Sequence, residues 1–228
     1  VHGNYPALRV VLAAIDTMEV KQIISLGDVA GYYSMINECI DALRERAVVN
    51  LMGNHDHYIV DNVTCLRSNS ANASLAWQRR AITPQNLAWL AQSRRGGLRK
   101  GKLSMVHAGW NDPIDEYIEV ISAEYFADRD GEVFVSGHTH VQGVWPVGAK
   151  TYCNPGSVGQ PRDGDPRAAF AVWDDASMRL HRVDYDIDEI ASHMQAAGFA
   201  PHFYENLAMG TRIGGKLRVT LADYEPCF

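Results

Sequence analysis

Residues 48–56 read VVNLMGNHD, a short apolar run that stops abruptly at a glycine and continues with an asparagine, a histidine and an aspartate. Residues 22–28, QIISLGD, have the same form. A short apolar run that ends at a glycine-containing loop is typical of a buried strand in a parallel sheet. Between the two runs, residues 34–46 carry apolar side chains at helical spacing. The two strands and the helix between them therefore predict a parallel sheet with helices packed on its faces.

The segments on either side extend this alternation. The sequence NYP at 4–6 and the Thr-Pro pair at 83–84 each supply a capping residue followed by an early proline, and DIDE at 186–189 is a capping box. Residues 62–93 are helical in pattern, with the second of these helix starts inside them. Further strands are predicted over residues 103–106, 133–135, 141–147, 151–153, 168–173 and 178–185. Because we find no linker or repeat, we expect residues 1–228 to form one α/β domain.

The composition of the 228 residues is that of an ordinary globular protein, with 46% hydrophobic and 21% charged residues. It excludes a disordered, collagen-like or coiled-coil chain. The 21 basic and 27 acidic residues give a net charge of −6, and the basic residues form no stripe. A nucleic-acid duplex is therefore not expected as a partner. No apolar stretch reaches the ~18 residues of a membrane span and no leader is visible, so we expect no membrane association.

The four cysteines are widely spaced and include no CxxC pair: Cys39, Cys65, Cys153 and Cys227. This spacing fits free thiols in a reducing compartment better than a disulfide framework. We therefore expect a cytoplasmic protein. The sequence carries no P-loop and no dinucleotide-binding glycine fingerprint, so a nucleotide would enter only as a substrate.

Each predicted strand that precedes a glycine-containing loop ends in side chains of the kind that bind metals. The loops after strands are Gly27-Asp28, Gly53-Asn54-His55-Asp56, His107-Ala108-Gly109 and Gly137-His138-Thr139-His140, and a further loop, His2-Gly3-Asn4, precedes the first helix. Ligands of α/β proteins bind beyond the carboxyl ends of parallel strands, so these loops are expected to meet at one edge of the sheet. Five of the nine histidines lie in them. We refer to them as the motif loops.

The residue types in the motif loops narrow the choice of metal. Imidazole nitrogens mixed with carboxylate and amide oxygens, without thiolates, suit Mn²⁺, Fe or Zn²⁺ better than Ca²⁺ or Mg²⁺. Asp28 is a carboxylate that can bridge, and the number of ligands suggests two divalent ions. Two ions ~3.5–4 Å apart suit phosphoester hydrolysis. Taken singly, Asp28 can equally be a helix or turn cap and Asn54 a turn residue, while His107 or His138 alone fits a hydrogen-bonded histidine near the core. Their joint occurrence favours the metal site.

The motifs VHGN, GDVAGY, GNHD, VHAG and GHTH, in this order and spacing between residues 1 and 140, resemble those of the calcineurin-like metallophosphoesterase superfamily. The later NPGSVG, at 154–159, resembles the small prokaryotic phosphodiesterase branch. The resemblance implies a four-layer αββα sandwich of two mixed sheets. It also implies a phosphodiesterase or phosphatase that uses a metal-bridging hydroxide as the nucleophile. Mn²⁺ is the favoured metal, with Fe or Zn²⁺ as alternatives.

The resemblance also implies a role for each motif residue. Asp28 would bridge both metals, His2 and His140 would bind the first, and Asn54, His107 and His138 would bind the second. His55 would donate to a phosphate oxygen or to the leaving group, and Asp56 would orient His55 by accepting its other ring proton.

The family's first motif is Asp-x-His on a first strand, and this sequence begins at the middle position. We expect truncation rather than natural loss of that aspartate. A natural loss would predict weak activity, or a non-catalytic scaffold of the same fold that acts in protein–protein interaction, as the retromer scaffold subunit of the superfamily does.

Two further residues are candidates for binding the substrate, which we expect to be a small phosphoester and which can be a nucleotide. Asn154 lies in a loop that the resemblance places near the metals, although on local chemistry it reads as a turn. Arg162 can pair with a phosphate through its planar guanidinium, or lie in solvent beside Asp163 and Asp165. The histidines at 57, 181, 193 and 202 are interpreted as structural or surface residues. The sequence leaves open which ester is cleaved, which metal is native and which oligomer forms.

Overall fold

The structure is a computed structural model, and it describes residues 1–222. These residues contain the α-helices α1 (Tyr5–Asp16), α2 (Ile36–Glu45), α3 (Asn54–Val60), α4 (Asn69–Ala81), α5 (Pro84–Ala91), α6 (Ala123–Ala127) and α7 (Ile187–Ala196), and the 3₁₀ helices η1 (Pro201–Phe203) and η2 (Glu205–Met209). The strands are β1 (Ile24–Ser25), β2 (Val49–Asn50), β3 (Leu98–Lys100), β4 (Leu103–Met105), β5 (Val120–Ile121), β6 (Val133–Val135), β7 (Gly143–Val147), β8 (Lys150–Asn154), β9 (Ala168–Trp173), β10 (Met178–Val183) and β11 (Leu221–Ala222).

The largest sheet has five strands in the order β3-β4-β6-β8-β7. Its central strands β4, β6 and β8 are parallel, and the outer strands β3 and β7 are antiparallel to their neighbours, so the sheet is mixed. Two strand pairs lie against it: the parallel pair β1–β2 and the antiparallel pair β9–β10. The parallel pairing that we predicted for residues 22–26 and 48–52 is confirmed, although β1 and β2 are shorter than those runs.

The side chains of these strands form the core between two layers. Apolar residues of β4, β6 and β8 pack on residues of the two strand pairs and the loops that follow them, in a cluster that includes Leu103, Met105, Val133, Val135, Cys153, Leu26, Leu51, Ala171 and Trp173. On the other face of the large sheet, Phe134 and Tyr152 pack on Phe126 of α6. Alternate side chains of a strand point to opposite faces, which explains why neighbours in β6 and β8 belong to different clusters.

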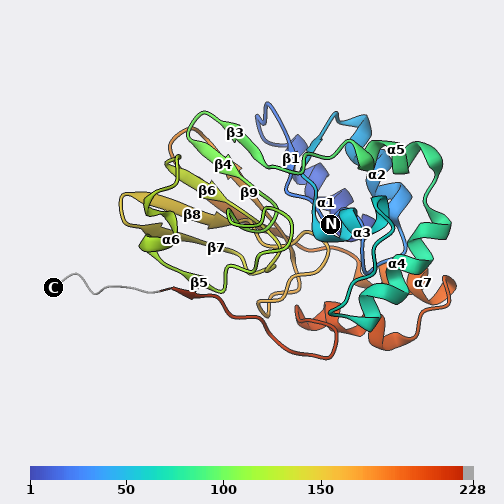
Figure 1. Cartoon of the computed structure of the whole chain (residues 1–228). Helices are drawn as coiled ribbons and strands as arrows, with labels where there is room; N and C mark the ends of the chain where they lie inside the picture. The colour runs from blue at the N-terminus through green and yellow to red at the C-terminus, as the bar shows by residue number, and fades with distance from the viewer. Residues whose placement is uncertain (223–228) are drawn as a thin grey trace.

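The outer face of the β9–β10 pair is covered by α1, where Ala7 and Val11 contact Ala168 and Phe170. The layers therefore run helix, strand, strand, helix, and Figure 1 shows most helices on one side of the strands and α6 on the other. The predicted αββα arrangement is confirmed. After α7 the chain runs back along the molecule, and β11 pairs in parallel with β5 (Figure 1).

The predicted helix starts are confirmed by their caps. The Asn4 side chain accepts from the amide of Ala7, the Thr83 side chain from that of Asn86 and the Asp186 side chain from that of Glu189. The helix α3 was not predicted, because the Gly-Asn pair at its start reads as a plain turn. Gly53 instead caps it in an extended conformation, and the Asp56 carboxylate accepts from the Gly53 amide at 3.3 Å. Helix α6 was also missed.

Cys39, Cys65 and Cys153 are free and buried, in agreement with the prediction, while Cys227 lies outside the described residues. Within residues 1–222, no helix combines the length and the apolar character that crossing a bilayer requires.

Candidate active site

Asp28 lies in the loop after β1 and is 4% exposed. Its Oδ1 accepts from the backbone amide of His55 at 2.9 Å, which fixes the carboxylate. Its Oδ2 lies 3.6 Å from Nε2 of His2 and 3.5 Å from Nε2 of His107. Asp28 is therefore placed between two histidine-bearing loops that are 105 residues apart in the sequence (107 − 2).

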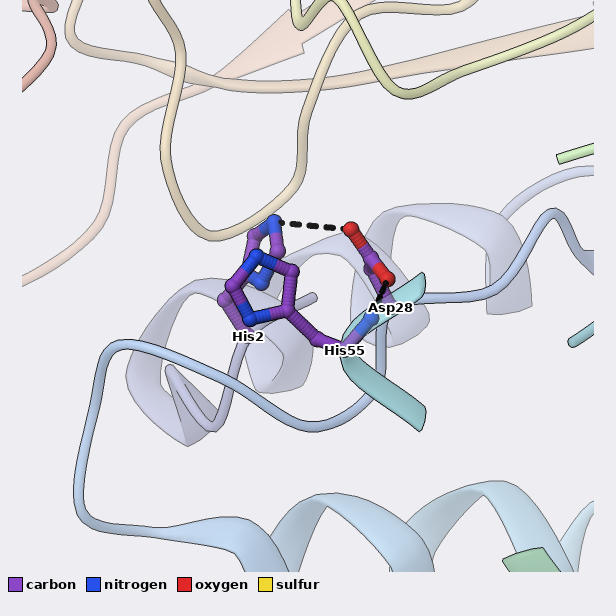
Figure 2. Close-up of side chains that lie close together, drawn as sticks. All are labelled: His2, Asp28 and His55. Atoms are coloured by element: carbon purple, nitrogen blue, oxygen red, sulfur yellow. Dashed lines mark hydrogen bonds and ion pairs between the residues drawn. The ribbon is translucent and has the colours of Figure 1, made fainter. Parts of the chain in front are cut away.

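On one side of Asp28, His2 and His55 complete a group whose possible ligand atoms all lie within 4.8 Å of one another. Figure 2 shows the two imidazole rings beside the carboxylate, with the contacts from Asp28 to each residue. His140 belongs to the same side, since its Nε2 lies 3.0 Å from Nε2 of His2.

On the other side, Asp28, His107 and His138 form a second group within the same 4.8 Å limit. Nε2 of His107 lies 3.2 Å from Nδ1 of His138 and 3.3 Å from Oδ1 of Asn54. The structure thus brings together all six residues that the sequence predicted as metal ligands. They fall into two groups that share Asp28, as a bridging carboxylate would.

The backbone fixes the tautomer of three of these histidines. Each donates from Nδ1 to a carbonyl oxygen, which can only accept: His2 to Ala30 at 2.9 Å, His107 to Leu26 at 2.7 Å and His140 to Gln160 at 2.6 Å. Burial lowers the pKa of His2 and of His140 well below the ordinary histidine value, so both rings are neutral at pH 7. Their Nε2 atoms therefore carry lone pairs that face each other at 3.0 Å.

Facing lone pairs repel unless something positive lies between or beside them. Neutral imidazole nitrogens, a buried carboxylate and an amide oxygen are the donors that a borderline transition metal prefers. The donor set of these residues therefore fits a pair of divalent cations. The carbonyl partners of the Nδ1 atoms are of the kind that orients histidine ligands in metal sites.

The backbone at four of these residues is in the left-handed region, with φ of 60° at His2, 54° at Asp28, 60° at His138 and 63° at His140. Such a conformation is uncommon for residues other than glycine and costs about 1–3 kcal/mol each. It turns the chain sharply within the motif loops. Backbone strain is therefore concentrated at the candidate site.

The glycine of GNHD is required by a close approach. A Cβ on Gly53 would lie 2.2 Å from Oδ1 of Asp28 and 2.3 Å from its backbone nitrogen. A glycine at this position is therefore what lets the loop after β2 approach the carboxylate of Asp28.

His55 is buried and its Nδ1 has no hydrogen-bond partner in the described residues. The expected hydrogen bond from His55 to Asp56 is absent, and that prediction is wrong. The carboxylate of Asp56 instead accepts from the amides of Ala30 at 2.9 Å and Gly53 at 3.3 Å, because it serves the start of α3 and the GDVAGY loop. Asp56 is fully buried and acts on the backbone of the site.

Asn154 does not line the cavity beside the site. Its Nδ2 donates to the carbonyl of Gly137 at 2.8 Å and to Thr139 Oγ1 at 2.9 Å, and its Oδ1 accepts from the amide of Gly156 at 2.9 Å. The first two contacts are with the GHTH loop, and the third lies within the turn of Asn154 itself. Asn154 therefore orients that loop, and the prediction that it contacts substrate is corrected.

Arg162 is 5% exposed and lines the cavity, so the alternative that placed it in solvent beside Asp163 and Asp165 is excluded. Its amide donates to the carbonyl of His140 at 3.2 Å, which ties it to the GHTH loop. Its guanidinium donates to Gln160 Oε1 at 2.6 Å and to the Tyr32 hydroxyl at 3.1 Å.

The cavity has a volume of about 300 Å³, and Asn54 and His55 are among the residues that line it. Besides Arg162 it is lined by three arginines and three tyrosines: Arg67, Arg212, Arg218, Tyr32, Tyr58 and Tyr117. A basic, aromatic cavity next to the candidate metal ligands suits an anionic organic substrate.

Two contributors were missed by the sequence analysis. Oδ1 of Asp115 lies 3.8 Å from Nε2 of His138, and neither atom has a hydrogen-bond partner within the described residues. Gln160 accepts from His140 through its backbone and from Arg162 through its side chain. Neither residue stands next to a strand end in the sequence, so the pattern that revealed the motif loops could not reveal them.

The sequence and the fold were compared with those of known proteins. The chain is 29% identical over 210 residues to the uncharacterized protein MJ0912 of Methanocaldococcus jannaschii, covering 82% of this chain and 86% of that protein. A metallophosphoesterase from Sphaerobacter thermophilus superposes with a TM-score of 0.78 at 30% identity, over 92% of this chain and 95% of the other. The hypothetical protein PH1004 of Pyrococcus horikoshii shares the fold, with the same TM-score and coverage at 18% identity.

The sequence profile of the calcineurin-like phosphoesterase superfamily domain matches residues 1–177, which include every motif loop. The chain belongs to the calcineurin-like phosphoesterase superfamily.

Proposed function

We propose that this protein is a phosphoester hydrolase that depends on two divalent metal ions. The observation that carries the proposal is the position of Asp28, whose carboxylate belongs to both groups of possible ligands. Such sharing is what a dinuclear site requires of a bridging carboxylate.

In this proposal His2, His140 and Asp28 hold one ion, and Asn54, His107, His138 and Asp28 hold the other. When bound, a pair of divalent ions supplies activation of the attacking water and neutralises charge on the entering and leaving oxygens. We favour Mn²⁺, because the set mixes nitrogen and oxygen donors and lacks thiolates, while Fe and Zn²⁺ share most of these preferences.

The remaining polar groups act on the substrate. His55 lines the cavity, and its buried Nδ1 has no hydrogen-bond partner among residues 1–222, so the ring is assigned to a phosphate oxygen or to the leaving group. Burial lowers the pKa of His55 to about 4, so the ring is neutral at pH 7 and donates a hydrogen bond without carrying a charge. Arg162 supplies a buried positive charge to a phosphate. The substrate is then a small phosphoester, for which a nucleotide is a candidate. The buried free thiols support a cytoplasmic location.

The test is hydrolysis of p-nitrophenyl phosphate and bis-p-nitrophenyl phosphate by protein loaded with Mn²⁺. We expect turnover, and we expect Asp28→Asn, His138→Ala and His55→Ala each to lower kcat by orders of magnitude. Asp174→Asn, a surface substitution on the β9–β10 turn, is the matched control. Absence of turnover across a broad phosphoester panel, together with absence of bound metal, would overturn the proposal and leave a non-catalytic scaffold.

A further inference from the structure

The cavity beside the candidate metal ligands carries more positive charge than its acidic neighbours balance. Four arginines and one glutamate line it. Arg67 pairs with Asp115, and Arg218 pairs with Glu119 at 2.5 Å. Arg162 and Arg212 have no carboxylate within 4.0 Å among residues 1–222. A guanidinium as buried as that of Arg162 is costly without an anion, so the cavity is built to receive one.

Two of these arginines come from a segment beyond the part of the chain that matches the family profile. That match ends at residue 177, whereas Arg212 and Arg218 lie in the segment that returns from η2 to β11. The amide of Arg218 donates to the carbonyl of Arg162 at 2.8 Å, so the returning segment is fixed to the loop that holds Arg162. Figure 1 shows this segment running beneath the strands. These contacts connect His140, Arg162 and Arg218 through backbone hydrogen bonds.

The aromatic ring of Tyr117 contacts the guanidinium groups of Arg218 and Arg67. The guanidinium of Arg218 lies 4.0 Å from the ring centroid and that of Arg67 lies 5.3 Å from it. The same ring lies 3.9 Å from the ring of His138, one of the candidate metal ligands. Tyr117 therefore connects these two arginine side chains to the candidate metal ligand His138. Burial lowers the pKa of Arg218 despite the opposing effects of Tyr117 and Glu119, and the guanidinium groups of Arg162 and Arg212, which line the same cavity, act in the same direction as burial.

We propose that Arg162, Arg212 and Arg218 form a subsite for a second phosphoryl group of the substrate, distinct from the one that is cleaved. This inference rests on the proposed function, because it assigns the scissile phosphate to the metal ligands. It predicts that the preferred substrates are phosphoesters that carry at least two phosphoryl groups. Guanidinium groups bind phosphate oxygens in pairs, so several of them can distinguish a second phosphate from a neutral group.

A binding experiment on metal-free protein tests the subsite without requiring catalysis. Titration calorimetry at fixed salt is expected to show tripolyphosphate binding at least tenfold more tightly than orthophosphate. Arg212→Gln is expected to weaken tripolyphosphate binding at least fivefold. Arg212 is exposed, so its replacement does not threaten the fold. Arg179→Gln removes the same charge from β10 and is expected to bind like wild type. Equal affinities for the two anions, or equal losses in the two variants, would overturn the subsite.

A kinetic experiment then asks whether the second phosphate belongs to the substrate. The p-nitrophenyl ester of thymidine 5′-phosphate is compared with the same ester carrying an added 3′-phosphate, using Mn²⁺-loaded protein. We expect the added phosphate to lower KM at least tenfold, and Arg212→Gln to remove most of that advantage. Tripolyphosphate binding without turnover of either ester would count against the proposed function and leave the anion subsite standing. Turnover with equal KM values would overturn the second-phosphate assignment.

Discussion

Nε2 of His2 lies 3.0 Å from Nε2 of His140, and neither nitrogen carries a proton, because each ring donates from Nδ1 to a backbone carbonyl. Two lone pairs at this distance favour a cation, so the metal-free fold should be less stable than the loaded one. At a metal concentration 100 times Kd, binding raises the free energy of unfolding by about 2.7 kcal/mol. For a chain of this size that corresponds to a rise in Tm of about 5–10 °C. Calorimetric scans with Mn²⁺ and with EDTA measure it.

The control for this experiment is Asp174→Asn, which changes an exposed carboxylate in the turn between β9 and β10 and should respond to Mn²⁺ as wild type does. Identical Tm values for wild type in Mn²⁺ and in EDTA would show that the facing nitrogens do not bind metal.

Asp28 should affect both ions, whereas His140 should affect one. In Asp28→Asn the amide oxygen can still accept from the His55 amide, so the fold should persist while the shared negative charge is lost. We expect elemental analysis to find neither ion in Asp28→Asn and one retained ion in His140→Ala. Equal metal content in the two variants would contradict the assignment of Asp28 as the shared ligand.

Gly53 should not tolerate replacement, because a larger side chain would collide with Asp28. Its backbone conformation, with φ of −87°, is open to any residue. Alanine there would place its Cβ 2.2 Å from Oδ1 of Asp28, which forces the loop after β2 to move. We expect a loss of about 1–3 kcal/mol in the free energy of unfolding, measured in urea, together with loss of metal. Gly96→Ala is the matched control, since a Cβ at Gly96 meets nothing within 4 Å. Wild-type metal content in Gly53→Ala would contradict this account.

Asp115 should tune the metal site through His138. Its Oδ1 is the nearest carboxylate oxygen to Nε2 of that ring, at 3.8 Å, and the contact can tighten when the ring binds a metal through Nδ1. Loss of such a carboxylate partner lowers metal affinity about 10–100-fold. We expect a decrease of that size for Asp115→Asn in metal titrations, with the fold intact by circular dichroism. Asp130→Asn, whose side chain is 88% exposed, is expected to titrate like wild type, and an equal change in both would exclude a specific role for Asp115.

Alkaline pH should destabilise the protein through its buried tyrosines. Burial raises the pKa of Tyr33 and of Tyr152 above that of an exposed tyrosine. The unfolded chain therefore releases these protons first as the pH rises above about 10, and the folded state loses stability from that pH upward. Urea midpoints at pH 8, 10 and 11 should decrease across the last interval, and decrease less in Tyr152→Phe. A constant midpoint would contradict the expected titration.

The sequence alone was sufficient to predict the layers and the convergence of the six candidate metal ligands. Strand runs that end at Gly27 and at Gly53 indicated parallel strands, and parallel strands bring their carboxyl ends to one edge. Apart from His2, which precedes α1, the candidate ligands lie in loops that follow those ends, so their convergence was a consequence of topology. The same reasoning could not detect α3, because the Gly-Asn pair at its start reads as a plain turn, and its cap depends on the contact of Asp56 with the Gly53 amide.

The contacts made by Asp56 and Asn154 could not be predicted, because both depend on distances between loops that are remote in sequence. Asp56 accepts from Ala30, 26 residues earlier, and Asn154 donates to Gly137, 17 residues earlier. The arginine cluster was hidden for the same reason. Arg212 and Arg218 become neighbours of Arg162 only because the chain returns after η2.

The left-handed backbone at His2, Asp28, His138 and His140 implies that two kinds of mutational survey will disagree at these positions. A survey that selects for resistance to heat in the absence of metal should tolerate or favour glycine there, since glycine adopts this geometry without penalty. A survey that selects for turnover should reject it. Positions that rank high in one survey and low in the other would then mark the residues of the candidate active site without any assay of metal content.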